Sequence, residues 1–392
     1  MEYIPFEEAL RIVLGEAVSL PSEETAMEES LGRILAEDIF SDVDMPPFDK
    51  SAVDGFAIRM EDLAYDLEII ETIPAGKKPE KKIGPRQCSR IMTGGMLPEG
   101  ANGVLMVEDT EVTGPERIRF TKDKSGVNIC FRGEDVRAGD KVLEKGTLLH
   151  DRHLAVLASV GATRIRVGSR PRTGILSTGD ELVEPDRKPD GPFIRNSNAA
   201  QLIAQVREAG CIPSYFGIAP DEPGMLEEMI RKATGETGLL LVSGGVSMGE
   251  LDFVPAILRQ LGYDILVHGI SIQPGRPTIF AKKENRFIFG LPGNPVSSFV
   301  LFEVLVKPFL RKMMGGIPDD PRIRLPLGAD FLRRKSNRKA FIPVRIREGE
   351  IFPVDYHGSA HIHAYASADG IIAMETGVSK LRKGEWVYVR PI

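Results

Sequence analysis

The chain has 392 residues, of which 42% are hydrophobic and 27% are charged. This length exceeds what one hydrophobic core usually organises, so we expect about two to four folded domains and no extensive disorder. The formal net charge of -6 excludes the broad basic surface that nucleic-acid binding requires, so any anionic ligand must be held by local features.

The three cysteines, Cys88, Cys130 and Cys211, lie far apart and show no paired spacing. Such a set is typical of reduced thiols in a cytoplasmic protein. The N-terminal MEYIPFEEAL has no basic region followed by an apolar core, so no secretory signal is expected. The most apolar segment, VSSFVLFEVLVKPFL, is interrupted by two charged residues, which predicts a buried helix and no membrane span.

Helical patterns occur on both sides of an extended region in the first 170 residues. Residues 6–14 and 31–36 carry apolar side chains at helical spacing, and the pattern returns after Asp151, a favourable N-cap. Between them, residues 43–139 contain short apolar runs separated by glycine and proline, which predicts a β-rich unit. The sequence therefore predicts a discontinuous helical linker domain, residues 1–42 and 140–170, that is interrupted by a β-rich insert.

Strands and helices alternate from Pro171 to residue 318. The predicted strands are TGILST, a segment near 214–218, GLLLV, PTIFA and RFIFG, and a long helix is predicted at 296–312. Shorter helices are predicted to begin at Asn196 or Ser197, at Asp221 and at Asp252. This alternation predicts a three-layer α/β domain whose mostly parallel sheet is buried on both faces.

The last segment, residues 319–392, loses the helical period. Apolar and polar residues alternate in RIRLPL, AFIPVRI, GIIAMET and EWVYVR, which predicts a small C-terminal β-barrel or sandwich. The fold class is therefore a multidomain α/β protein.

Two strands of the predicted sheet end in glycine turns. TGILST runs into Gly179–Glu181, and GLLLV runs into Ser243–Gly245. In open α/β sheets ligands bind at the carboxyl ends of strands, and glycine lets backbone N–H groups approach a phosphate. Either turn could equally be a tight strand exit, so both interpretations stay open.

Three carboxylates lie near these turns: Glu181, Asp221 and Asp252. Helix capping alone could explain the two aspartates, and Glu181 could be a solvated loop charge. If the three converge on a cleft that also holds a phosphate, their repulsion would be severe unless a cation were shared between them. Mg²⁺ is commonly held by carboxylates, phosphate oxygens and water, so a magnesium site is the functional hypothesis.

Two further motifs, PGRP and LPGNPVSSF, lie at the ends of the two short strands. Arg276 could clamp an oxyanion with two hydrogen bonds, or it could be a solvated turn arginine. Pro292 and Pro295 restrict the backbone, which predicts a rigid loop leading into the long helix. Ser297 and Ser298, just beyond, make a second anion pocket conceivable.

Taken together, these motifs resemble the MoeA family of molybdopterin molybdenumtransferases, to which the C-terminal half of gephyrin also belongs. The resembling stretches cover nearly the whole chain, and their order is more specific than any one turn. They are LGRILAEDI, DMPPFDKSAVDGFAIR, RIMTGGMLPEGANGVLMVED, RGEDVRAGD, ILSTGDEL, SGGVSMGELDFV, PGRP and FGLPGNPVSSF.

The resemblance implies an enzyme of molybdenum cofactor biosynthesis. Such an enzyme inserts molybdenum from molybdate into adenylylated molybdopterin, with Mg²⁺-dependent release of AMP. It also implies a molybdopterin-binding α/β domain and a cytoplasmic homodimer in which the insert of one subunit reaches the α/β domain of the other. Transient contact with the molybdopterin adenylyltransferase is expected, and neither nucleic acid nor a membrane is an expected partner.

The resemblance further implies a role for individual residues. The catalytic positions are Asp54, Asp135, Glu181, Asp221 and Asp252, and the last three are also the magnesium ligands. The positions that bind the pterin nucleotide or the oxyanion are Thr93, Thr178, Gly179, Ser243, Gly244, Gly245, Arg276, Pro292, Pro295, Arg338 and Ser359.

This chain departs from the family pattern at Gln273, where a lysine or arginine usually precedes PGRP. The loss of a fixed cation leaves the preference between molybdate and tungstate open. His357, His361 and His363 are expected to be ordinary strand-edge residues, because no pattern of carboxylate or cysteine ligands accompanies them.

Two alternative functions stay open at this point. The first is a molybdopterin adenylyltransferase, because a related α/β domain catalyses that reaction. The second is a non-catalytic dimeric scaffold. The insert and the C-terminal domain favour the molybdenum-inserting enzyme over the adenylyltransferase, and the acidic residues argue against a scaffold.

Overall fold

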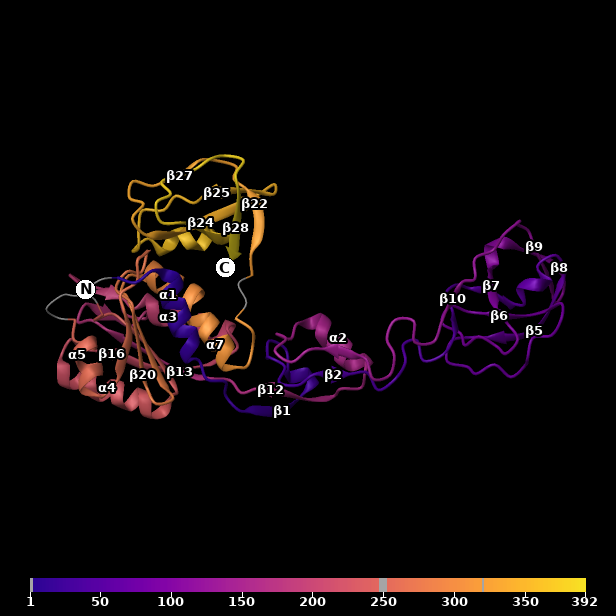
Figure 1. Ribbon diagram of the computed structural model, residues 1–392, viewed down its shortest axis with the longest axis horizontal. Coiled ribbons are helices and arrows are strands. Elements are labelled where there is room, and N and C mark those ends of the chain that lie inside the picture. The colour runs from indigo at the N-terminus through magenta and orange to yellow at the C-terminus, as the bar shows by residue number, and fades with distance from the viewer. Residues whose placement is uncertain (1–2, 247–251, 319–320) are drawn as a thin grey trace. The chain divides into compact units, whose positions relative to one another are not determined.

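A computed structural model of the chain describes residues 3–246, 252–318 and 321–392. The chain forms two compact units. The larger unit comprises Met1–Glu37, Lys145–Asp151 and Arg164–Ile392, and the smaller unit comprises Asp38–Glu144 and Arg152–Thr163 (Figure 1). The four-part division expected from the sequence stays a prediction.

The larger unit contains a six-stranded sheet. Its order is β16 (Ile212–Ala219), β13 (Arg172–Thr178), β17 (Leu239–Ser243), β21 (Arg286–Leu291), β20 (Ile279–Lys283) and β18 (Asp264–His268). The first four strands are parallel, whereas β20 and β18 are antiparallel to their neighbours. The predicted, mostly parallel sheet is confirmed, and β18 is an additional edge strand.

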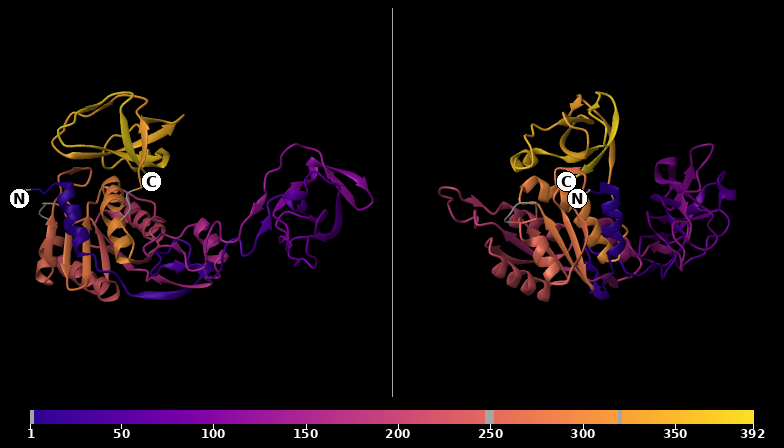
Figure 2. Two further views of the ribbon diagram at one scale, coloured as in Figure 1. Left: turned by 45° about the vertical axis from the view of Figure 1, so that its right-hand side comes forward. Right: turned by 60° about the vertical axis from the view of Figure 1, so that its left-hand side comes forward.

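Helices cover both faces of this sheet (Figures 1 and 2). Along β17, Leu239 and Leu241 pack with α3 (Ser197–Glu208), whereas Leu240 and Val242 pack with α4 (Pro223–Glu236) and α5 (Val254–Gln260). Because alternate side chains of a strand point to opposite faces, a strand covered on both sides must be apolar throughout. The continuous apolar run GLLLV therefore belongs to the central layer of three.

The long helix predicted at 296–312 forms as three consecutive pieces: α6 (Pro295–Leu301), a π-helical turn η4 (Phe302–Val306) and α7 (Lys307–Met313). Pro308 has no N–H for the helical hydrogen-bond ladder, and a widened turn precedes it. Phe309 on α7 lies edge-on to Phe280, Phe287 and Phe289 of the sheet, with ring centroids 5.6, 5.0 and 5.4 Å away. These aromatic contacts hold α7 against the sheet.

The helix predicted from residue 6 is α1 (Phe6–Glu16). Phe6, Ala9 and Val13 recur on one helical face and are buried in the core of the α/β sheet. The helix predicted after Asp151 is α2 (Asp151–Ser159).

The prediction of a helix at 31–36 is wrong. Gly32 has a φ of +74°, which ends helical geometry, and Ile34 and Leu35 form isolated antiparallel bridges with Leu148 and Val167. Periodicity misled here because both apolar side chains are buried by pairing with distant extended segments.

A second sheet contains the C-terminal strands. Its order is β19 (Ile272–Gln273), β24 (Lys339–Arg347), β26 (Gly370–Met374), β28 (Trp386–Pro391) and β22 (Ile323–Pro326), with β25 (Glu350–Pro353) also paired to β24. A single bridge between Leu327 and Ile351 joins the chain after β22 to β25. The β-rich character is as predicted, while a closed barrel stays a prediction.

The smaller unit is β-rich, as expected. Its six-stranded sheet has the order β7 (Gly103–Met106), β4 (Gly55–Ile58), β6 (Gln87–Ile91), β5 (Leu67–Ile73), β9 (Arg117–Phe120) and β8 (Thr110–Gly114). Phe56 and Ile58 pack on one face and Ala57 on the other, in two apolar clusters. Outside this sheet, β3 (Lys50–Ser51) pairs with β10 (Ile129–Cys130).

The three cysteines are free thiols, as expected. Burial raises the pKa of Cys88 and of Cys211 to about 12, so both remain protonated at neutral pH. In the described part of the chain, no helix is long and apolar enough to cross a membrane.

Candidate active site

A cavity of about 1020 Å³ lies at the carboxyl ends of the parallel strands in the larger unit. Thr178 ends β13, Ser243 ends β17, and Asp221 and Gly293 lie in the loops that follow β16 and β21. The lining residues are Thr178, Gly179, Glu181, Leu182, Ile194, Arg195, Asn196, Ser197, Asn198, Asp221, Ser243, Gly244, Gly245, Asp252, Gly293, Asn294, Pro295, Ala360, Ile362 and His363.

Two aspartates connect the loops after β13 and β16. The Asp221 carboxylate accepts hydrogen bonds from the Thr178 hydroxyl at 2.9 Å and from the Asp180 N–H at 3.4 Å. In return, the Asp221 N–H donates to the Asp180 carboxylate at 3.1 Å. This reciprocal pairing fixes the orientation of the Asp221 side chain at the cavity wall.

Neither Asp221 nor Asp252 begins a helix as predicted. α4 begins at Pro223, and the Glu222 carboxylate caps it by accepting from the N–H groups of Gly224 and Met225. α5 begins at Val254 after Phe253, so Asp252 does not cap it. Helix capping therefore explains neither Asp221 nor Asp252, and the predicted helix starts are wrong by two residues at each site.

Glu181, Asp221 and Asp252 bring three carboxylates to one cavity from three separate loops. Among the described residues, no three His, Cys, Asp or Glu side chains are close enough to hold a metal by themselves. A cation here would need further oxygen ligands from substrate and water. Carboxylate oxygens that face an open cavity suit Mg²⁺, which usually keeps such external ligands.

Two N–H groups of the glycine turns are used in main-chain hydrogen bonds. The Gly179 N–H donates to Ala219 O at 3.3 Å, and the Gly244 N–H donates to Leu291 O at 3.0 Å. Gly244 has a φ of +101°, and a Cβ there would lie 2.4 Å from Thr178 O. Because these two N–H groups are occupied, neither is free to bind a phosphate, and the role predicted for the glycine turns stays a prediction.

The start of α3 supplies lining residues whose place in the cavity the sequence did not indicate. Asn198 Nδ2 donates to Ser243 Oγ at 2.7 Å and to Gly293 O at 2.8 Å, so it joins the strand ends of β17 and β21. Asn196 caps α3 through the Ala199 N–H and donates to the Tyr215 hydroxyl. The predicted cap at Asn196 is thus confirmed. The second asparagine of the segment NSN, Asn198, was the sequence signal for a further polar contact beyond the cap.

Tyr215 continues this chain of contacts by donating to Glu184 Oε1 at 2.9 Å. Burial, and then the Glu184 carboxylate, raise the pKa of Tyr215 well above its ordinary value. The phenol therefore stays protonated and serves as a fixed donor.

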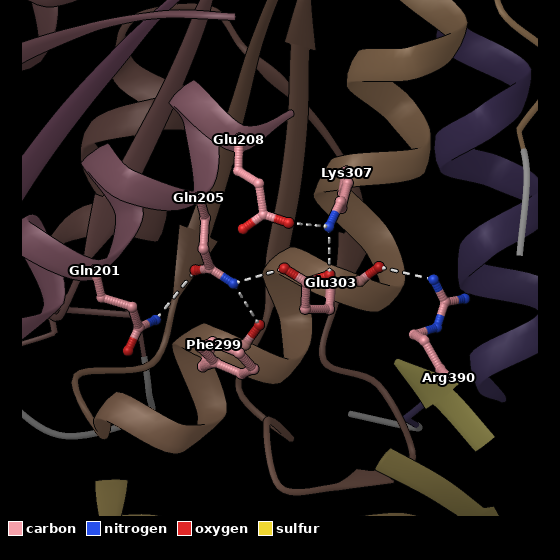
Figure 3. A network of polar contacts seen from close by, with 7 residues as sticks. All are labelled: Gln201, Gln205, Glu208, Phe299, Glu303, Lys307 and Arg390. Carbon is pink, nitrogen blue, oxygen red and sulfur yellow. Dashed lines mark hydrogen bonds and ion pairs between the residues drawn. The ribbon is translucent and has the colours of Figure 1, made fainter. Parts of the chain in front are cut away.

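A polar network joins α3 to the helix that begins at Pro295 (Figure 3). Gln205 donates to Glu303 Oε1 at 2.9 Å, and Lys307 donates to Glu303 Oε2 at 2.9 Å. Arg390 of β28 donates to the main-chain oxygen of Glu303 at 3.3 Å. Since the first residues of both helices line the cavity, this network keeps two of its walls in place.

The proline loop and the C-terminal domain form another wall. Pro295 lines the cavity, whereas Pro292 is buried and does not line it. The main-chain oxygen of Ser359 accepts from the Val296 N–H at 3.0 Å, and the following residues Ala360, Ile362 and His363 line the cavity.

The three histidines do not lie at a strand edge, so that prediction is wrong. They are located in and before the 3₁₀ helix η5 (Ile362–Ser367), between β25 and β26. The rings of His357 and His361 stack 5.0 Å apart, and His357 lies 3.2 Å from Asp355.

Arg276 and Arg338 lie together in a separate pocket of about 250 Å³, with Tyr3, Ser271, Lys335 and Asn337. The Arg276 guanidinium lies 3.9 Å above the Tyr3 ring, and Arg338 donates to Ile272 O at 3.3 Å. The parallel pairing of β19 with β24 brings these two distant segments side by side.

Asp54, Thr93 and Asp135 belong to the smaller unit. Asp54 Oδ1 accepts from the Thr93 N–H at 2.6 Å and from the Thr93 hydroxyl at 2.8 Å. These two hydrogen bonds hold the pKa of Asp54 below its ordinary value. Asp135 is exposed, and its N–H donates to Met45 O at 3.0 Å.

The architecture is that of a multidomain α/β protein with an acidic cavity at its strand ends. Three family models match the chain: "MoeA N-terminal region (domain I and II)" at residues 4–161, "Probable molybdopterin binding domain" at 174–312, and "MoeA C-terminal region (domain IV)" at 324–392.

Relatives and solved structures agree with these matches. A molybdopterin molybdenumtransferase of Bacillus subtilis (strain 168) is 36% identical over 98% of this chain and 93% of its own length. One from Staphylococcus epidermidis is 34% identical, covering 98% and 95%. The molybdopterin biosynthesis moeA protein of Pyrococcus horikoshii OT3 is 30% identical, with a TM-score of 0.86 over 100% of both chains. The chain therefore belongs to the MoeA family of molybdopterin molybdenumtransferases.

Proposed function

We propose that this protein inserts molybdenum from molybdate into adenylylated molybdopterin and releases AMP in a Mg²⁺-dependent reaction. Family membership over almost the full chain supports the activity. The observation that carries the detailed proposal is the convergence of Glu181, Asp221 and Asp252 on one cavity. Its volume of about 1020 Å³ suits a ligand as large as a pterin nucleotide.

The cavity residues have distinct parts in the proposal. Thr178 and the Asp180 N–H orient the Asp221 carboxylate. The Ser243 hydroxyl accepts from Asn198, so its own proton is available to donate to a phosphate oxygen of the substrate. The phosphate end of the nucleotide then lies between the Ser243–Gly245 turn and the Thr178–Glu181 turn.

Glu181, Asp221 and Asp252 would hold Mg²⁺ together with phosphate oxygens and water. When bound, the ion supplies Lewis acidity toward the phosphoanhydride bond. Because no three acidic side chains of the described residues lie close enough to hold a metal by themselves, oxygens of substrate and water would have to supply the remaining ligands.

Molybdate, as the second substrate, would occupy the pocket of Arg276 and Arg338. Two guanidinium groups in one small pocket provide the charge and the hydrogen-bond donors that an oxyanion requires. Gln273 directly precedes the PGRP segment that contains Arg276, and it supplies no charge. This lack of charge bears on the choice between molybdate and tungstate. Ser359, which the resemblance assigns to the oxyanion, directly precedes Ala360 on the wall of the main cavity and lies outside the lining of both pockets.

The remaining site residues would come from the smaller unit. Asp54, Thr93 and Asp135 would complete the site within a cytoplasmic homodimer, where the insert of one subunit serves the cavity of the other. A transient complex with the molybdopterin adenylyltransferase would deliver the adenylylated substrate.

The proposal is tested by replacing Asp221 with asparagine, which keeps the shape of the side chain but removes its charge. AMP release from adenylylated molybdopterin with molybdate and Mg²⁺ should fall by roughly 100-fold. Asp264→Asn, on the exposed part of β18, is the matched control and should keep full activity. Unchanged AMP release by Asp221→Asn would contradict the proposal, and consumption of ATP by the wild type would favour the adenylyltransferase.

A further inference from the structure

Among the described residues that line the main cavity, carboxylates outnumber lysine and arginine. Glu181, Asp221 and Asp252 contribute carboxylates, whereas Arg195 is the only lysine or arginine among the described residues that line it. We propose that Arg195 binds a phosphate of the nucleotide part of the substrate. This inference rests on the proposed function, because it assigns the recognition of that ligand to one further residue.

The backbone of Arg195 is held on both sides. Arg195 lies in β15 (Ile194–Arg195), which pairs in parallel with β14 (Leu182–Val183). The Ile194 N–H donates to Glu181 O at 2.8 Å, and the Asn196 N–H donates to Val183 O at 2.8 Å. The arginine is therefore fixed to the loop that carries Glu181 and directly precedes the cap of α3.

The side chain is anchored at one end only. Arg195 Nε donates to Arg187 O at 3.0 Å, which restricts the guanidinium plane. In the described part of the chain, no carboxylate forms an ion pair with it, and its two terminal nitrogens have no hydrogen-bond partner. A planar guanidinium with both terminal nitrogens available is suited to two parallel hydrogen bonds with a phosphate.

A phosphate bound in this acidic cavity needs positive charge beside it. A phosphate that enters among three carboxylates is repelled unless positive charge is near it. A bound Mg²⁺ would meet part of this requirement, and Arg195 supplies a permanent charge on the same wall as Glu181. Among the described residues, no hydrogen bond joins Arg195 to Thr178 or Asp180, which orient Asp221, so its expected contribution is to binding and not to the chemical step.

The experiment compares Arg195→Gln with the wild type by calorimetry with AMP as the probe in the presence of Mg²⁺. AMP affinity should fall roughly fivefold to tenfold, because a charge-assisted hydrogen bond at an exposed site is partly screened. In turnover, KM for adenylylated molybdopterin should rise by a similar factor, while kcat changes less than about twofold. Arg195→Lys should recover part of the AMP affinity.

The matched control is Arg207→Gln, which removes one positive charge from the exposed C-terminal end of α3. It should leave AMP affinity and KM unchanged. The inference is overturned if Arg195→Gln binds AMP as tightly as the wild type, or if Arg207→Gln weakens binding equally. A wild type that binds AMP through Arg195 but never releases AMP from the substrate would refute the proposed function alone.

Discussion

At the scale of single residues, the carboxylates of this protein are held by specific donors. Asp54 is exposed, yet its pKa is lowered because the N–H and hydroxyl of Thr93 both donate to one of its oxygens. Asp221 is held similarly by Thr178 and Asp180. Both aspartates could be found from sequence motifs, but their donors follow only from the loop conformations.

Replacing Thr93 with valine should raise the pKa of Asp54 toward its ordinary value, because the hydroxyl donor is lost while the N–H donor remains. These hydrogen bonds favour the ionised carboxyl, so their stabilising effect is present above the ordinary pKa and is lost as pH falls through the lowered one. Carboxyl carbon NMR titration measures the shift. Asp66, whose pKa is lowered by Arg119, is the internal reference, and an unmoved Asp54 would contradict the assignment.

Residue types alone could not decide between the two interpretations of the glycine turns. The N–H of Gly244 belongs to the sheet, because it donates to Leu291 O. That donor is assigned only once the register of β17 and β21 is known. The hydroxyl of Ser243, one residue earlier, accepts from Asn198 and remains able to donate.

At the scale of elements, apolar periodicity predicted the layers well. GLLLV and the flanking strands are apolar throughout because helices cover both faces. The same signal failed at 31–36, where Ile34 and Leu35 are buried through bridges to Leu148 and Val167, far along the chain. Local spacing cannot distinguish burial on a helix face from burial by a distant extended partner.

Glu303 provides a prediction at this scale, because it joins α3 to the helix running from Pro295 to Met313. Glu303→Ala should lower the free energy of unfolding by about 3 kcal/mol, because Gln205 and the largely buried Lys307 lose their shared acceptor. Urea unfolding measures the change.

The control for Glu303 is Glu208→Ala, which removes the other carboxylate that contacts Lys307. The Glu208 side chain is 69% exposed, so its removal should lower stability by no more than about 0.5 kcal/mol. Equal losses in the two variants would mean that the buried network does not hold the helices together.

At the scale of the whole molecule, the two pockets proposed to bind anions are assembled from segments far apart in the chain. The PGRP motif and the resemblance pointed to Arg276 and Arg338 separately, but only the parallel pairing of β19 with β24 places them in one pocket. Such pairing depends on how the C-terminal sheet meets the α/β domain. No local sequence pattern predicts that contact between sheet and domain, so the sequence alone yielded Arg276 and Arg338 as two separate candidates.

A shared pocket predicts that the two arginines act on one ligand. Arg276→Gln and Arg338→Gln should each weaken molybdate binding by roughly tenfold, and the double variant should lose less than the product of the two factors. Calorimetric titration with molybdate measures all four proteins. Arg347→Gln, at the exposed end of β24, should bind as the wild type does, and fully multiplicative losses would mean that the two sites are independent.

The pairing of β3 with β10 has a consequence for how this chain could be modified. Ser51 lies opposite Ile129, and Lys50 lies opposite Cys130, so the chain enters and leaves the six-stranded sheet of the smaller unit through adjacent strands. A two-residue hairpin turn would be enough to reconnect them. We therefore expect that the six-stranded sheet can be deleted or replaced as one inserted segment. Related proteins could gain, lose or exchange it while the rest of the chain keeps its path.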